Sequence, residues 1–211
     1  MPGLPSVSPT PPSNAFEADI QQVRSTLIDV LENGRDVVIV FHGYGGLPSC
    51  AALKGIHDIP NLQARVTRIV AYSSWLVPEG RTLQDELGGD ISRLFNKQND
   101  LVYYHAAGET CYNAVPNSIK TAALELLLPQ AHGTFTAAAR YEAWRDFPIT
   151  YIFCDKDEVL PPRYREIQPG SLDPRVRKIP HGHAAHAVVP AWVAAIIREA
   201  AGEKLLQESE H

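Results

Sequence analysis

Three histidines stand close together near the carboxyl end of the chain, at His181, His183 and His186. Two aspartates, Asp155 and Asp157, stand upstream of them, directly after an apolar segment. A histidine that is oriented by a carboxylate can take up and return protons, which is general acid-base catalysis. Alternating imidazoles can also bind a metal ion, but no nearby carboxylate or cysteine completes a ligand set. On its own, His183 in a Gly-His pair more often makes a single hydrogen bond in a loop, but its place after the last predicted strand and its distance to Pro190 favour a site residue. We expect neither a metal nor a cofactor.

A glycine-rich turn is the second feature that bears on chemistry. The apolar run 36–41 leads directly into a tight turn around Gly43, and a short helix is predicted over 47–55. A strand, a tight turn and a helix in this order form the geometry of a nucleophile elbow, in which the turn residue presents the nucleophile. Gly43 has no side chain that could serve in this way. Ser49 and Cys50 lie further along the helix and should face away or be buried, so they do not replace it.

The elements that position these residues follow from hydrophobic periodicity. Apolar residues recur at helical spacing from Phe16 to Leu31, which predicts an amphipathic helix over 15–33 that Asn14 caps and Gly34 closes. Val and Ile runs without alternation are typical of parallel strands that are covered on both faces. Such strands are predicted at 36–41, 66–74, 149–154 and 176–179, and the last helix at 191–206. The expected fold is α/β, with a parallel sheet of about four strands and helices on both faces.

A long stretch, residues 79–147, separates the second and third strands. Material inserted after the carboxyl end of a strand in an open parallel sheet overhangs the place where ligands bind. We therefore interpret 79–147 as a helical lid over a small, mostly apolar pocket. Within it, helical segments are predicted at 90–95, 118–128 and 137–144. The proline-rich residues 1–14 should form an extended, loosely held arm before the domain proper, 15–211.

Composition excludes several classes of function. The 211 residues are 45% hydrophobic and 20% charged, which is enough for one sizeable core. The net charge of −5 comes without a Lys/Arg run, so nothing attracts nucleic acid or anionic lipid. The amino terminus lacks a secretion signal, and no apolar run is long enough to cross a bilayer. Three scattered cysteines, Cys50, Cys111 and Cys154, are expected to be reduced thiols. We expect a cytoplasmic protein whose ligand is a small molecule.

Four segments of the chain resemble one family. The run Asp36-Val37-Val38-Ile39-Val40-Phe41-His42-Gly43-Tyr44-Gly45-Gly46 is similar to the elbow of small α/β-hydrolases of the methyl-esterase and hydroxynitrile-lyase type, which ends in His-Ser-Tyr-Gly-Gly. Residues 70–80 resemble the family's strand leading into the lid, and 144–157 resemble its acid-bearing strand. Gly182-His183, with Pro190 seven residues after the histidine, resembles its histidine loop. The order of elbow, acid and histidine is also the family's. The resemblance covers almost the whole chain after residue 15 and implies Asp157 as the acid and His183 as the catalytic histidine, which leaves Asp155 as a turn residue.

Two departures from the family change the implied chemistry. Gly43 stands where the family has serine, so the covalent acyl route is closed. The family also begins with two strands and an oxyanion-binding loop, which we expect this chain to lack. The Tyr44 N–H and the positive end of the following helix remain as oxyanion donors. A serine hydrolase without its triad keeps about 10³- to 10⁴-fold catalysis through binding and the oxyanion hole. With that hole incomplete, ordinary esterase activity should be negligible.

The pair of His183 and Asp157 suits a lyase, an isomerase or a cyclase, because positioned acid-base catalysis is worth roughly 10²- to 10⁴-fold by itself. We hypothesise a non-hydrolytic enzyme that acts on a small, largely apolar organic molecule, with room for a substrate oxygen beside Gly43. The alternative is a catalytically inactive ligand-binding or scaffold protein, because glycine adopts the strained elbow conformation without penalty. A residual esterase is the third reading. Further candidates for the oxyanion site and the pocket are Tyr44, Ser74, Trp75, Tyr103, Tyr104, His105 and Tyr112.

The strand before the elbow bears on partners. It is central in the family's sheet, whereas here the strand 36–41 should lie at an edge. A long apolar edge strand invites aggregation unless another chain covers it. We therefore predict a homodimer, or pairing with another subunit, through 36–41 and the helix 15–33.

Overall fold

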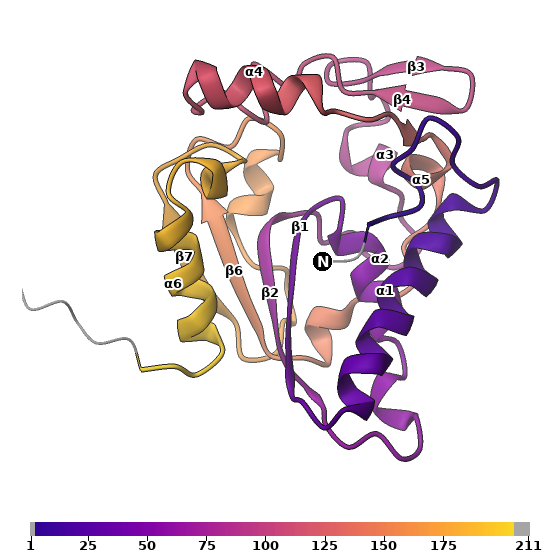
Figure 1. Ribbon diagram of the computed structural model, residues 1–211, viewed down its shortest axis with the longest axis vertical. Helices are drawn as coiled ribbons and strands as arrows, with labels where there is room; N and C mark the ends of the chain where they lie inside the picture. The colour runs from indigo at the N-terminus through magenta and orange to yellow at the C-terminus, as the bar shows by residue number, and fades with distance from the viewer. Residues whose placement is uncertain (1–2, 205–211) are drawn as a thin grey trace, which may run out of the picture.

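The predicted strands assemble side by side in the computed structural model, which describes residues 3–204 (Figure 1). The main sheet has the order β1-β2-β6-β7, and all neighbouring strands in it are parallel. Its strands are β1 (Val37–Gly43), β2 (Val66–Ser74), β6 (Ile149–Cys154) and β7 (Arg175–Ile179). The predicted four-stranded parallel sheet is thereby confirmed. Because the strands run in the same direction, the segments that follow β1, β2, β6 and β7 meet at one edge of the sheet.

Helices cover both faces of this sheet. α1 (Ala15–Glu32) and α2 (Gly46–Leu53) pack on one face, where Phe41, Ile69 and Tyr151 join their apolar side chains in the larger core. α6 (Pro190–Ala200) covers the other face and packs on alternate residues of the same strands. α1 buries the predicted apolar stripe and ends before Gly34, which has φ +72. Asn14 takes the cap position but makes no side-chain capping bond.

Residues 79–147, here called the lid segment, cross above the carboxyl edge of the sheet (Figure 1). A second, antiparallel sheet lies within this segment, formed by β3 (Asn96–Gln98), β4 (Leu101–Tyr103) and β5 (Gln130–Ala131). The helices of the lid segment are α3 (Leu83–Glu86), α4 (Asn117–Glu125) and α5 (Gly133–Thr136), and a short 3₁₀ helix, η2 (Ala143–Arg145), follows them. Two further 3₁₀ helices, η3 (Pro162–Arg165) and η4 (Ala185–Ala187), lie after the lid segment. One more such helix, η1 (Ile56–Asp58), follows α2.

The helix predicted at 118–128 exists as α4, but two other predicted lid helices do not form. At 90–95 the Asp90 carboxylate accepts hydrogen bonds from the Ser92 N–H (2.8 Å) and hydroxyl (2.9 Å), which fixes a turn instead. At 137–144 the backbone is extended up to η2, because Ala139 pairs with another part of the lid segment. Its N–H donates to the Arg81 carbonyl (2.7 Å) and its carbonyl accepts from the Gly80 N–H (2.9 Å). Tertiary pairing overrides the helix propensity of an alanine-rich segment.

The amino-terminal arm is packed at Ser6 and Val7, so the expectation that it is loosely held is wrong for this part of it. Ser6 is fully buried, its N–H donates to Asp19 Oδ1 of α1 (2.8 Å) and its carbonyl accepts from the Ala131 N–H (2.9 Å). Val7 forms an antiparallel bridge with Gln130 of β5. The proline-rich sequence excludes regular structure but does not prevent the backbone from bonding to α1 and the lid segment.

The edge strand lies where it was predicted, whereas the last helix is shorter than predicted. Within residues 3–204, β1 pairs with β2 alone, and Val40 on it is 41% exposed, so β1 is an edge strand as expected. The homodimer through this edge remains a prediction. α6 ends at Ala200, short of the predicted 206, and residues 205–206 lie outside the described part of the chain. No helix in the described ranges is long and apolar enough to cross a membrane.

Candidate active site

The turn between β1 and α2 has the geometry of an elbow. Gly43 sits at φ +53, a region that costs an L-residue roughly 1–2 kcal/mol. The turn is closed by the Gly45 N–H, which donates to the His42 carbonyl (2.9 Å). From β2, the Ser74 hydroxyl donates to the Gly43 carbonyl at 2.8 Å and the Trp75 N–H donates to the same oxygen at 3.2 Å. The neighbouring strand therefore fixes the turn that glycine permits.

This arrangement corrects the roles suggested for Ser74 and Trp75. Ser74 is fully buried and its hydroxyl is used at the elbow, so it supports the site without lining an open pocket. Trp75 is also buried and packs edge-to-face on Tyr164, with 5.1 Å between the ring centroids. Ser49 and Cys50 of α2 are buried, as expected, and neither replaces a nucleophile at position 43.

His183 and Asp157 meet above the sheet, although 26 residues separate them in the sequence. The two atoms His183 Nδ1 and Asp157 Oδ2 lie 2.8 Å apart, and both side chains are buried. The other carboxylate oxygen accepts from the Val159 N–H (2.8 Å) and the Leu160 N–H (3.1 Å). Burial alone would raise the pKa of Asp157, but the hydrogen bond and charge of His183 and these two N–H donors together hold it below its ordinary value. The carboxylate is therefore ionised. Asp155 is exposed and does not take part.

The imidazole of His183 faces Gly43. A Cβ built on Gly43 would lie 3.4 Å from His183 Nε2 and 3.9 Å from Cε1. A hydroxyl on such a Cβ could approach Nε2 to hydrogen-bond distance, which is the relation between a nucleophile and its base. The volume that such a side chain would fill lies directly in front of Nε2.

Tyr44 contributes its backbone to the site and not its side chain. Its hydroxyl donates to Asp19 Oδ2 of α1 (2.7 Å), so the ring points away from His183. Burial, and after it the charge of Asp19, raises the pKa of this phenol above its ordinary value. Among residues 3–204, no acceptor pairs with the Tyr44 N–H, which stands beside Gly43 at the start of α2. The N–H is thus available to a ligand oxygen, as in an oxyanion site.

Comparison with known proteins shows the family of this fold. A family model described as "Alpha/beta hydrolase family" matches residues 1–196. The chain belongs to the alpha/beta hydrolase family. The alpha/beta hydrolase nvfD of Aspergillus novofumigatus (strain IBT 16806) is 28% identical over 96% of this chain and 84% of its own length. The probable hydrolase R7 of Phoma sp. (strain ATCC 20986 / MF5453) is 30% identical over 90% of this chain and 80% of its own. Polyneuridine aldehyde esterase has the same fold, with a TM-score of 0.67 at 13% identity over 87% of this chain and 78% of its own.

Part of the lid segment of this α/β hydrolase packs onto the two loops that carry His183 and Asp157. The Cys111 carbonyl accepts from the Ala184 N–H (3.2 Å), directly after His183. The Asn113 side-chain amide donates to the Lys156 carbonyl (2.9 Å), directly before Asp157. The lid segment is therefore bonded to the residues that flank both members of the pair.

The four lid candidates divide into two groups. Tyr104 is partly buried near the acid: burial raises the pKa of its phenol, and the charge of Asp157 contributes to that rise. Tyr112 is half-buried beside Cys111. Tyr103 is 38% exposed, and the His105 ring bonds to the Ser92 carbonyl (2.9 Å), so these two lie on the outer side of the lid segment. Tyr103 and His105 are thus not placed to line the site.

Three residues that the sequence did not single out for this purpose surround the backbone of His183. His42 precedes Gly43 on β1, Tyr72 is its register partner on β2, and His186 lies in η4. Their rings contact one another, and the His42 ring also contacts the His183 ring. The signal that could have found His42 and Tyr72 is a pair of polar aromatic side chains at the carboxyl ends of adjacent strands. The alternative of a metal cluster at His181, His183 and His186 does not form, because no described group of three or more His, Cys, Asp or Glu side chains could hold a metal ion.

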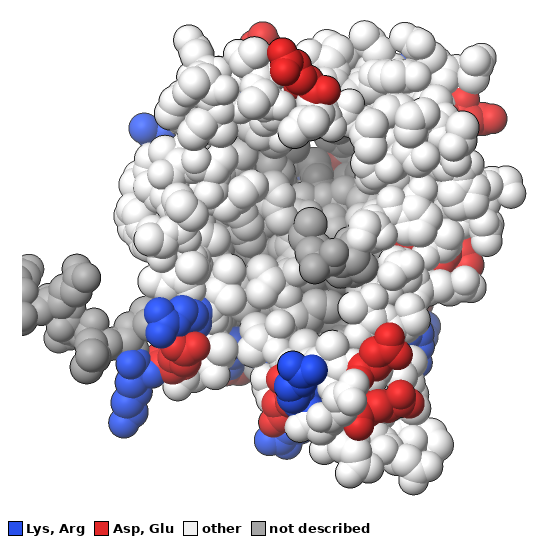
Figure 2. All heavy atoms as spheres, viewed as in Figure 1, with Lys and Arg blue, Asp and Glu red and all other residues white. Residues whose placement is uncertain are grey.

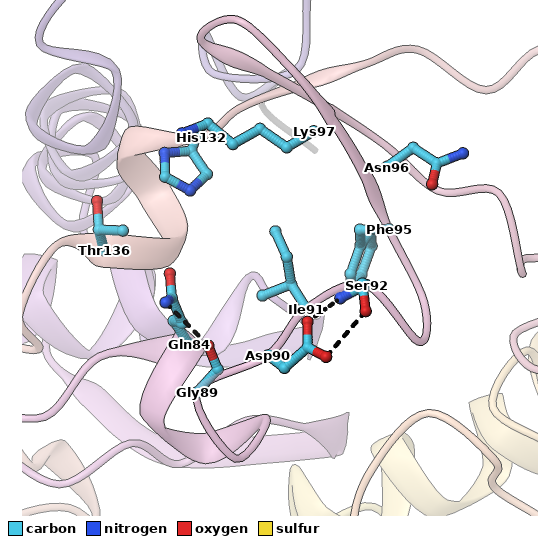
Figure 3. A pocket seen from close by; sticks show the side chains of 10 residues that line it. All are labelled: Gln84, Gly89, Asp90, Ile91, Ser92, Phe95, Asn96, Lys97, His132 and Thr136. Atoms are coloured by element: carbon cyan, nitrogen blue, oxygen red, sulfur yellow. Dashed lines mark hydrogen bonds between the residues drawn. The ribbon is translucent and has the colours of Figure 1, made fainter.

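A pocket of about 540 Å³ lies elsewhere, on the lid segment (Figure 3). Most of its lining residues are polar, and they are Gln84, Gly89, Asp90, Ile91, Ser92, Phe95, Asn96, Lys97, His132 and Thr136. None of them is a predicted site residue, and the Phe95 ring packs on Tyr104, with 4.5 Å between the centroids. This pocket is therefore not the expected apolar cavity beside His183, which remains a prediction.

Proposed function

We propose that this α/β hydrolase performs non-hydrolytic acid-base chemistry, of the lyase, isomerase or cyclase type, on a small organic molecule. His183 transfers the proton at Nε2, Asp157 orients the imidazole, and the Tyr44 N–H polarises a ligand oxygen. The observation that carries the proposal is the position of Nε2, which faces Gly43 at 3.4 Å from a built Cβ. A ligand oxygen can take the place that a serine hydroxyl occupies in other members of the family.

The hydrogen bonds determine which nitrogen of His183 is the base. The ionised Asp157 carboxylate can only accept, so the proton of the neutral imidazole lies on Nδ1 and the lone pair on Nε2. When Nε2 takes a proton from the ligand, the resulting imidazolium lies against the carboxylate at 2.8 Å, which stabilises it. Return of the proton to another atom of the same molecule completes an isomerisation, and its return to a departing group completes an elimination.

The surface above the strands supports a small, largely uncharged ligand. The space-filling view shows the face hollowed between the lid segment and the carboxyl edge of the sheet (Figure 2). The Lys, Arg, Asp and Glu side chains on the described part of this face gather mostly at the opposite end, around the lower turns (Figure 2). Charged substrates are usually held by charged or multiply hydrogen-bonded groups, and apolar lining is typical of sites for neutral molecules.

One observation favours a second function, that of a catalytically inactive ligand-binding or scaffold protein. Glycine at φ +53 relieves the strain that a serine would bear, so selection for stability alone would retain Gly43. Such a protein would keep the fold, and it would bind ligands in the hollow without changing them.

A deuterium-exchange assay tests the acid-base function before the substrate is known. The protein is incubated in D₂O with a panel of neutral enolisable ketones and esters, and ¹H NMR follows loss of the α-proton signal. Wild type should accelerate exchange of some member of the panel by about 10²- to 10⁴-fold over His183→Ala. His132→Ala removes a histidine of the lid pocket and serves as the matched control, which should exchange like wild type.

The outcomes separate the candidate functions. Exchange that is equally fast in wild type and His183→Ala would refute His183 as the base. Compounds that bind by calorimetry but show no accelerated exchange would support the inactive binding protein. His183-dependent release of alcohol from the esters would instead indicate a residual esterase and contradict the non-hydrolytic assignment.

A further inference from the structure

The backbone carbonyl of His183 receives two side-chain donors from the sheet. His42 Nε2 lies 3.0 Å from this oxygen, and the Tyr72 hydroxyl lies 3.2 Å from it. Both donors stand at the carboxyl ends of strands, in register with each other on β1 and β2. His183 itself lies in the connection between β7 and η4, which has no sheet pairing of its own. Two paired strands of the main sheet thus bond to the main chain of His183, whose side chain the proposed chemistry requires in a defined position.

Tyr72 holds this connection at more than one point. Its hydroxyl also accepts from the His186 N–H (3.0 Å) and lies 3.3 Å from His186 Nδ1. Tyr72 is buried, and its ring stacks on His42 with 4.7 Å between the centroids and 26° between the planes. The His42 ring in turn lies 4.3 Å from the His183 ring. The two aromatic side chains therefore form one packed unit against the histidine loop.

The protonation of His42 suits this arrangement. A carbonyl oxygen only accepts, so His42 Nε2 carries a proton, and the neutral ring then has a bare Nδ1. The titratable groups that face it are Tyr72 on β2 and His183 and His186 on the histidine loop. Burial is the largest cause that holds the pKa of His42 well below its ordinary value, and the electrostatic effect of His183 and His186 lowers it further. The ring is thus neutral at neutral pH and does not oppose a positive charge on His183, as a cation 4.3 Å away would.

From these contacts we infer that His42 and Tyr72 are positioning residues, which fix the main chain of His183 so that its Nδ1 meets Asp157 and its Nε2 faces Gly43. The inference rests on the proposed function for its catalytic meaning, but the positioning itself is a structural property. Misplacement of a reacting group by about 1 Å can cost 10²-fold in rate. The two hydrogen bonds at this carbonyl should therefore affect the rate by more than their contribution to folding stability suggests.

NMR of the ¹⁵N-labelled full-length protein tests the inference. The signal observed is that of the Nδ1–H proton of His183, which bonds to Asp157. Tyr72→Phe removes one donor and His42→Leu the other. Each change should shift this signal and make its exchange with water about 2- to 10-fold faster, the equivalent of one hydrogen bond. His42→Gln restores an N–H donor near the position of Nε2 and should return the exchange rate towards wild type.

Tyr151→Phe is the matched control. The Tyr151 hydroxyl is buried on the adjacent strand and donates to the Ser74 carbonyl (2.8 Å), so its loss removes the same kind of bond without touching the histidine loop. It should lower stability, through the loss of one buried hydrogen bond, but leave the His183 signal in place. An unchanged signal in Tyr72→Phe and His42→Leu, or an equal change in Tyr151→Phe, would overturn the inference. If the signal responds as expected but no compound undergoes His183-dependent exchange, the positioning stands and the proposed function fails.

Discussion

Gly43→Ser is the change that probes the site most directly. The serine would take φ +53, which costs about 1–3 kcal/mol of stability. For a chain of this size, each kcal/mol lowers Tm by about 2–4 °C, so the variant should melt about 2–12 °C below wild type. Gly43→Ala bears the same backbone strain without a hydroxyl, and it should show the same loss of Tm.

The expected gain in esterase activity follows from two opposing terms. Loss of a serine nucleophile costs about 10⁶-fold in kcat in a complete serine hydrolase. Absence of one oxyanion donor costs about 10²- to 10³-fold, and the Tyr44 N–H is the single donor identified here among residues 3–204. The difference predicts that Gly43→Ser hydrolyses p-nitrophenyl acetate about 10³- to 10⁴-fold faster than Gly43→Ala.

Mass spectrometry of quenched samples should also show an acetyl group at position 43 in the serine variant. His183→Ala in the Gly43→Ser background should abolish both the activity and the adduct, because the hydroxyl then has no base. A folded Gly43→Ser protein that acquires no adduct and hydrolyses the ester no faster than Gly43→Ala would refute the geometry derived for His183 Nε2.

Three further predictions concern stability and assembly. The pKa of Asp157 is lowered in the folded state, so its stabilising contribution is complete above the unfolded value of about 3.9 and is lost as pH falls from there through the lower folded pKa. The gap in urea midpoint between wild type and Asp157→Asn should therefore begin to narrow below about pH 4. Glu86→Gln should cost about 3 kcal/mol by urea unfolding, because this buried carboxylate accepts three side-chain hydrogen bonds, whereas Glu79→Gln at an exposed ion pair should cost at most about 1 kcal/mol. If the edge strand forms the predicted homodimer, Val40→Lys should convert it to monomer in sedimentation velocity, and a monomeric wild type would refute the dimer.

The sheet could be predicted from the sequence because its strands have an unambiguous pattern. The run Val37-Val38-Ile39-Val40 and the largely apolar residues of β2 and β6 have no helical periodicity, and the glycine-rich turn fixes where β1 ends. The pairing of His183 with Asp157 came from resemblance to a family and not from spacing, since parallel strands bring together residues that are distant in the chain.

The lid segment was predicted less well for a physical reason. Ile91, Leu94 and Phe95 have helical spacing, but the chain turns at Asn99, with φ +54, to form the hairpin of β3 and β4. Within 90–95 itself, Asp90 followed by Ser92 was a turn signal that the helix interpretation overlooked. The role of Tyr72 could not be foreseen from the sequence in the same way, because a buried strand tyrosine carries no local mark of the carbonyl to which it donates.

The bonds of Ser6 have a practical consequence for anyone who handles this protein. Asp19 receives the Ser6 N–H on one oxygen and the Tyr44 hydroxyl on the other, so a single carboxylate joins the amino-terminal arm to the elbow. A purification tag fused in front of the arm, or a protease cut within it, would disturb Tyr44, whose N–H we propose as the donor to a ligand oxygen. Altered behaviour of amino-terminally tagged protein would then report on the site itself, so the position of the tag is an experimental variable to be controlled.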